Sequence, residues 1–212
     1  IETYKSLFLV CSYDPGTNTK YQYEVSFRKN ELDGLVKHLV ESDRDFLITF
    51  NGVYFDTQIL QYIVDCYERW THSTWRQVVD DIFYFAQKTI DDRNYELPPK
   101  YKEQYLSFKQ IDLYLLLHYN NDARRSSLKW AAEFSLDGDI EELPIDFRQE
   151  ELTSMEIDEV IAYCWNDVIA TYNLYKVCIG DTDHPDYKGK NKVQLRLDLI
   201  EEYKFSHVTL NW

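Results

Sequence analysis

The stretch SLFLVCSYDPGTNTKYQYEVSF, residues 6–27, decides the fold of this chain. Residues 6–13 are apolar and rich in side chains that favour β-strands, so they are predicted to form a strand. Residues 14–18 have the composition of a tight turn. Apolar and polar residues then alternate over 21–27, as in a strand with one buried face. The stretch therefore predicts an antiparallel β-hairpin.

Helical and strand patterns alternate through the rest of the chain. Apolar spacing predicts helices over 30–40, 54–70, 74–90, 127–134, 153–177 and 193–203, and short strands at 46–50 and 109–116. Thr153 and Glu156 form a capping box at the start of the longest helix. Strands that return through helices after an antiparallel hairpin favour an α/β fold with a mixed sheet flanked by helices.

The composition indicates a folded protein with no membrane span. Of the 212 residues, 44% are apolar and 16% aromatic, which is enough for the core of one large domain or two small ones. No window approaches 18 consecutive apolar residues. The cysteines form no C-x-x-C pair, so we expect a reducing, cytoplasmic setting and no structural zinc site.

The charge of the chain narrows the choice of partners. With 37 acidic and 23 basic side chains, the formal net charge is −14. Proteins that bind duplex DNA on their own concentrate Lys and Arg, because phosphate neutralisation supplies most of the affinity. The charge therefore argues against a simple duplex-binding module. It leaves room for a site whose carboxylates hold metal ions.

Three acidic residues stand out by their positions. Asp56 follows a predicted buried strand at the start of a helix, where sites of α/β proteins lie. Tyr163 and Asp167 share one face of the longest predicted helix, beside apolar neighbours, and Glu2 stands near the beginning of the sequence. Each also has an interpretation that involves no function. Asp56 could be a carboxylate favoured by the helix dipole, Tyr163 and Asp167 could match the pattern Tyr-x-x-x-Asp by chance, and Glu2 could be a solvated residue near the terminus.

Taken in order, these residues resemble a known set of motifs. Ile1-Glu2-Thr3, Asn51-x-x-x-Phe55-Asp56 and Tyr163-x-x-x-Asp167 resemble the three exonuclease motifs of the DEDD superfamily, in particular the proofreading domain of phage-type family B DNA polymerases. Residues 109–113 and 127–132 resemble the segments between those motifs. The resemblance covers nearly the whole chain and implies a ribonuclease H-like fold. It makes 1–180 the exonuclease domain, and 181–212 a linker and helix leading into a further domain.

The resemblance also implies an activity. It predicts a 3′→5′ exonuclease that removes nucleotides from single-stranded DNA ends with two Mg²⁺ or Mn²⁺ ions, beside a polymerase domain in cis or a replication partner in trans. Glu2 and Asp167 would hold the first ion, Asp56 would support the second, and Tyr163 would orient the attacking water. The other branch of the superfamily has a His where this chain has Ala162, so the chain is of the Tyr type.

Further residues are implied to contact the substrate. Thr3, Asn51 and Phe55 would meet the single-stranded 3′ end, with the Phe55 ring stacking on a base or, equally, packing in the core. Lys129 would contact a phosphate or stand solvated. Arg124 and Arg125 are weaker candidates for the same role. Asp112 is expected either to serve the site or to support the structure.

One residue of the family pattern is missing. The first Asp of the first motif, which bridges both ions in the family, would stand directly before Ile1. Without it we expect impaired metal binding, a shortened first strand and a sequence that is a piece of a longer protein, located in the host cytoplasm if it is viral. Two alternatives stay open: a ribonuclease of the same Tyr type, and a catalytically silent acidic interaction module.

Overall fold

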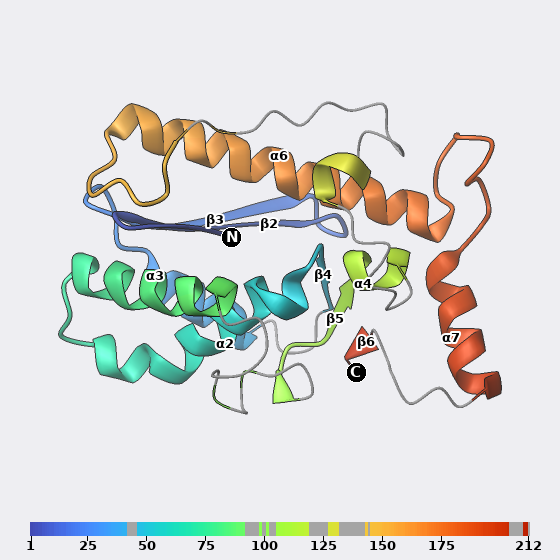
Figure 1. The fold of residues 1–212 in the computed structure, drawn as a ribbon, viewed down its shortest axis with the longest axis horizontal. Helices are drawn as coiled ribbons and strands as arrows, with labels where there is room; N and C mark the ends of the chain where they lie inside the picture. Colours follow the sequence, from blue (N-terminus) through green and yellow to red (C-terminus); the bar gives the residue numbers. More distant parts are fainter. Residues whose placement is uncertain are drawn as a thin grey trace.

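The computed structural model describes residues 1–41, 46–91, 98, 101, 105–118, 127–131, 143, 145–203 and 210–211. Figure 1 shows a layered arrangement of helices and strands. This confirms the mixed α/β class predicted from the sequence. The predicted contacts of Arg124 and Arg125 lie outside the described residues.

The predicted hairpin is confirmed and gains a third strand. β2 (Leu7–Asp14) and β3 (Thr19–Val25) pair antiparallel, and β1 (Glu2–Tyr4) pairs antiparallel with the other edge of β2. At the turn, the Asp14 carboxylate accepts hydrogen bonds from the Gly16 amide at 2.8 Å and the Thr17 hydroxyl at 2.6 Å. Asn18 then adopts a left-handed φ of 55°, which Asn tolerates better than most residues.

A second sheet contains β4 (Leu47–Thr49), β5 (Gln110–Asp112) and β6 (Leu210–Asn211). β4 and β5 are parallel, and β6 is antiparallel to β5. The sequence predicted one mixed sheet, whereas the described strands form two. Among them, β1 is only three residues long and pairs with β2 alone, so no described strand joins the sheets. The described topology is therefore not clearly ribonuclease H-like.

Most predicted helices are present, but the bounds of one predicted helix and one predicted strand are corrected. The helices are α1 (Leu32–Glu41), α2 (Asp56–Cys66), α3 (Trp75–Asp91), α4 (Leu113–His118), α6 (Ser154–Ile179) and α7 (Lys192–Tyr203), with 3₁₀ turns η1 (Gly52–Tyr54) and η2 (Tyr67–Trp70) and a helical stretch at 128–131. The helix predicted over 54–70 is thus divided between η1, α2 and η2. The strand predicted over 109–116 stops at Asp112, because the Asp112 carboxylate caps α4 by accepting from the Tyr114 amide.

The longest helix has the predicted start and a defined end. Thr153 and Glu156 form the capping box of α6, with the Thr153 hydroxyl and the Glu156 carboxylate each bonded to the backbone of the other. The helix stops at Gly180, whose φ of 79° suits a residue without a Cβ. None of the helices in the described part of the chain has the length and apolar character needed to cross a bilayer.

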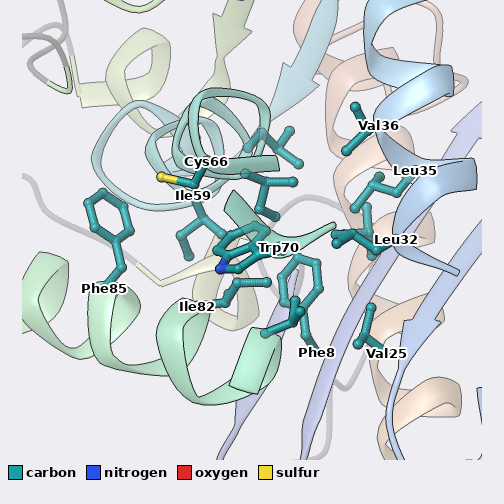
Figure 2. Packing of buried hydrophobic residues seen from close by; sticks show 14 of the residues in the cluster. Phe8, Val25, Leu32, Leu35, Val36, Ile59, Cys66, Trp70, Ile82 and Phe85 are labelled. Atoms are coloured by element: carbon teal, nitrogen blue, oxygen red, sulfur yellow. The ribbon is translucent and has the colours of Figure 1, made fainter. Parts of the chain in front are cut away.

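The strand β2 contributes to two hydrophobic layers because its side chains alternate between faces. In Figure 1, α6 runs along one face of the β1–β3 sheet, and α2 and α3 lie on the opposite face. Leu7 and Leu9 pack with Ile157 and Val160 of α6. Phe8 points the other way, into a cluster with α1, α2 and α3 that Figure 2 shows around Trp70. The sheet therefore fixes α6 against β1 and β2.

A buried ion pair also ties α6 to the sheet. Glu24 of β3 is fully buried, and both of its carboxylate oxygens accept hydrogen bonds from Arg28, at 3.0 and 2.9 Å. The same guanidinium donates to Asp158 at 2.7 Å and to the Ser154 carbonyl at 3.1 Å, both in the first turns of α6. Removing Arg28 would leave the Glu24 charge buried without its partner.

Candidate functional site

The three acidic residues singled out in the sequence come from three different elements. Glu2 lies in β1 on the same face as Tyr4, which packs in the cluster under α6. Asp167 lies within α6, one turn after Tyr163. Asp56 is the first residue of α2 and follows the loop that leaves β4. The sheet and its two helical layers thus present each carboxylate from a different element.

A positive group lies among these carboxylates. The Ile1 ammonium nitrogen is 3.1 Å from the Asp56 Oδ1 atom and forms an ion pair with it. Burial opposes the charge, but Asp56, Cys164 and Glu2 outweigh burial, and the pKa of the ammonium is raised well above its ordinary value. In this structure the Asp56 carboxylate is therefore paired with the Ile1 ammonium.

The pKa values of Glu2 and Asp167 show that the carboxylates interact. Burial raises the pKa of Glu2 to about 8, the Ile1 ammonium opposes this rise, and the negative charges of Cys164, Asp167 and Asp56 add to it. Burial raises the pKa of Asp167 to about 6, again with the ammonium opposing and Asp56 adding to the rise. Glu2, Asp56 and Asp167 thus share one partly buried region, and Glu2 is mainly protonated at pH 7 in the absence of a metal ion.

The donor set suits a hard divalent cation, although the described side chains are not arranged around one. Mg²⁺ and Mn²⁺ prefer carboxylate oxygens, and carboxylates from separate elements can hold them. Within the described residues, no group of three or more His, Cys, Asp or Glu side chains is positioned to hold a metal ion. The positive charge among Glu2, Asp56 and Asp167 is instead the Ile1 ammonium.

The other predicted site residues differ in how they are placed. Tyr163 is half-buried and close enough to Tyr4 for its charge to raise the Tyr4 pKa, after the larger effects of burial and Glu2. Asn51 is half-buried in the loop before Asp56, with a left-handed φ of 64°. Phe55 packs on the core cluster of α1, α2 and α3, which is the second of the two roles expected for it. Thr3 is buried in β1.

Lys129 is half-buried in the helical stretch 128–131. Its neighbours Leu128 and Ala131 pack with Leu174 and Cys178 of α6. Leu174 lies two turns beyond Asp167 along α6. The structure thus places Lys129 beside the later part of α6, and its predicted contact with a phosphate stays a prediction.

Two cysteines belong to the site region, although the sequence analysis gave them no role there. The neighbouring Cys11 thiol lowers the pKa of the Cys164 thiol, burial opposes this effect, and the Ile1 ammonium adds to it. Cys164 directly follows Tyr163, so its proximity to the site was readable from the third motif. Cys11 lies in β2 and is brought there by the packing of β2 against α6, which no local pattern encodes.

We expect the metal-free protein to lose stability as the pH rises from 5 to 7. Glu2 and Asp167 have pKa values above those of the unfolded chain, so the folded state binds their protons more tightly and a rising pH favours unfolding. The loss should be about 2–3 kcal/mol, or about 5–10 °C in Tm. Thermal denaturation in EDTA measures it. Glu2→Gln should flatten the dependence, and an equal slope in that variant would contradict the assignment.

No protein-family model, curated protein or solved structure matches this chain. The case for a function therefore rests on the motif residues and on the region that Glu2, Asp56 and Asp167 share.

Proposed function

We propose that this chain is a metal-dependent 3′→5′ exonuclease domain of the Tyr type, with a ribonuclease H-like fold, that releases mononucleotides from single-stranded DNA ends. One observation supports the proposal: Glu2, Asp56 and Asp167 are distant in sequence, yet the charges of Asp167 and Asp56 both contribute to the raised pKa of the buried Glu2. The order of the three motifs is what assigns these carboxylates to one site.

The residues suit phosphodiester hydrolysis. Mg²⁺ or Mn²⁺ ions, when bound, would activate water and stabilise the leaving oxygen. Glu2, Asp56 and Asp167 would hold them, and Glu2 would first have to release its proton because burial raises its pKa to about 8. The Tyr163 hydroxyl, one turn from Asp167 on the same helix, would orient the attacking water.

The proposal includes the substrate and the partner. Asn51, Phe55, Thr3 and Lys129 would contact the single-stranded 3′ end, and a base stacked on an aromatic ring is held without being identified. A net charge of −14 predicts weak, salt-sensitive DNA binding by this chain alone. Most of the affinity would come from a polymerase domain in cis or a replication partner in trans.

The test compares the chain with a version that carries an Asp directly before Ile1. That change moves the ammonium away from Asp56 and adds the missing carboxylate of the first motif, so it should raise Mn²⁺-dependent hydrolysis by about 100-fold. An extension with Asn in place of Asp is the matched control. The assay is the shortening of a 5′-labelled single-stranded DNA oligonucleotide. Absence of mononucleotide release from all three chains, or release that persists in EDTA, would contradict the proposal.

The same assay separates the alternatives. Preferential shortening of a labelled RNA oligonucleotide would identify a ribonuclease of the same Tyr type. The silent acidic module is suggested by the net charge of −14 and by the absence of the first Asp of the first motif from this sequence. It predicts that neither Mg²⁺ nor Mn²⁺ raises the Tm of the chain and that no extension creates activity.

A further inference from the structure

We propose that Asp112 and Gln110 of β5 are positioning residues that fix the segment 49–57 and, through it, the Asp56 carboxylate. This inference rests on the proposed function, because Asp56 needs a fixed position only if it serves a site. Asp112 and Gln110 alternate with Ile111 and so lie on the same face of β5, and both are fully buried.

The Asp112 carboxylate holds the loop that leads into Asp56. Its Oδ1 atom accepts the Asn51 amide at 2.9 Å, and its Oδ2 atom accepts the Val53 amide at 3.0 Å. Its Oδ1 atom also accepts the amides of Tyr114 at 2.9 Å and Leu115 at 3.4 Å, which belong to the start of α4. One buried side chain therefore binds two segments that are far apart in sequence.

Gln110 holds the far side of the same segment. Its Oε1 atom accepts the Thr57 hydroxyl at 2.9 Å and the Thr49 hydroxyl at 3.2 Å. Thr57 directly follows Asp56, and its hydroxyl oxygen also lies within hydrogen-bond distance of the Gly52 carbonyl. The two β5 side chains thus contact residues on both sides of Asp56, and they make no hydrogen bond to its carboxylate, which pairs with the Ile1 ammonium.

The loop between these contacts has little freedom to take another path. Asn51 adopts a left-handed φ of 64°, which costs free energy for a residue other than Gly. A Cβ atom added to Gly52 would lie 2.5 Å from the Thr49 Cβ atom, so only Gly fits there. Strained geometry of this kind persists only where surrounding contacts enforce it, and here the Asp112 carboxylate provides them.

The two tasks of Asp112 can be separated by substitution. Asp112→Ser keeps a hydroxyl that can cap α4, since Ser is a good N-cap residue. Its single oxygen on a shorter side chain cannot also bind the amides of Asn51 and Val53. Leu116→Ala is the matched control, because Leu116 is buried in α4 and its truncation weakens the same helix without removing a hydrogen bond to the loop.

The experiment measures hydrogen exchange and Mn²⁺ affinity in the full chain, well below its Tm. In Asp112→Ser, the amides of Asn51 and Val53 should exchange at least about tenfold faster, and Mn²⁺ should bind about tenfold more weakly. Leu116→Ala should leave both quantities unchanged. Thr57→Val, which replaces the hydroxyl with a methyl group of similar size, should weaken Mn²⁺ binding in the same direction by a smaller factor, and it provides the test if Asp112→Ser does not fold.

The two readouts distinguish failure of this inference from failure of the proposed function. Unchanged exchange at Asn51 and Val53, or faster exchange with unaltered Mn²⁺ affinity, would overturn the positioning role. An equal loss of Mn²⁺ affinity in Leu116→Ala would overturn it as well, because general destabilisation would then explain the effect. If the unsubstituted chain binds no Mn²⁺, the proposed function fails first, and the exchange data still test whether Asp112 holds the loop.

Discussion

Replacing Asp167 with Asn in the chain that carries an Asp before Ile1 should reduce Mn²⁺-dependent release of mononucleotides by about 10³-fold or more. Asn has nearly the shape of Asp, so the packing of α6 should be retained while one negative charge is lost. Asp167 lies in the region of Glu2 and Asp56, where that charge would help to hold the metal ion. Initial rates on a 5′-labelled single-stranded oligonucleotide at saturating Mn²⁺ measure the effect.

The control for this prediction is Asp186→Asn. Asp186 is exposed in the segment between α6 and α7, so its substitution removes the same charge from the chain without changing the site. Its rate should stay within about twofold of the parent chain, as for a neutral surface change. Activity that survives in Asp167→Asn, or an equal loss in Asp186→Asn, would show that the Asp167 carboxylate has no specific role.

The second large effect concerns stability: Leu9→Ala should lower the free energy of unfolding by about 3–4 kcal/mol. Leu9 is fully buried in the central strand of its sheet, directly opposite Glu2 in the register of β1 and β2. Its side chain packs with Ile157 and Val160, so truncation would leave a cavity between the sheet and α6. Urea denaturation at constant pH measures the change.

Met155→Ala is the reference for this second prediction. Met155 lies in α6, the helix that Leu9 packs against, and its side chain is 71% exposed. It should cost less than about 0.5 kcal/mol. Leu9 pairs with Glu2 of β1, and its side chain packs on α6. Leu9→Ala should therefore also weaken Mn²⁺ binding, because Glu2 and Asp167 could then move apart. A loss in Leu9→Ala no larger than in Met155→Ala would mean that α6 does not pack on β2 as described.

Local patterns were sufficient for much of the fold. The 6–27 hairpin follows from alternation and from turn residues such as Asp14, which bonds to its own turn. The capping box of Thr153 and Glu156 correctly located the start of α6. Such features depend on residues within one turn of one another, and these determine the outcome before tertiary contacts form.

The predictions were wrong where tertiary contacts determine where a strand ends and which strands pair. The pattern over 109–116 reads as one apolar strand, yet Asp112 ends the strand because its carboxylate binds amides on both sides, including Asn51 and Val53 of a distant loop. The division into two sheets depends on which strands pair, and apolar spacing does not encode pairing. The sequence therefore left the role of Asp112 open, although it named the residue.

The candidate site also has features that local sequence patterns predict and features that only tertiary packing determines. The identities and order of Glu2, Asp56 and Asp167 were readable from the motifs, and their role as one site stays a prediction. The ion pair of the Ile1 ammonium with Asp56 depends on how β1 lies relative to α2, and the proximity of Cys11 to Cys164 depends on the packing of β2 against α6. No sequence pattern could have placed these groups, because each joins residues from different layers.

The most direct test of the central claim is a Mn²⁺ titration followed by electron paramagnetic resonance at pH 8.5, where Glu2, with a pKa of about 8, is mostly ionised. If Glu2, Asp56 and Asp167 form a divalent-cation site, the chain should bind Mn²⁺. Glu2→Gln, Asp56→Asn and Asp167→Asn should each weaken binding by about tenfold or more, and Asp186→Asn should leave it unchanged. Binding that is absent in the unsubstituted chain, or equal in all five proteins, would contradict the claim.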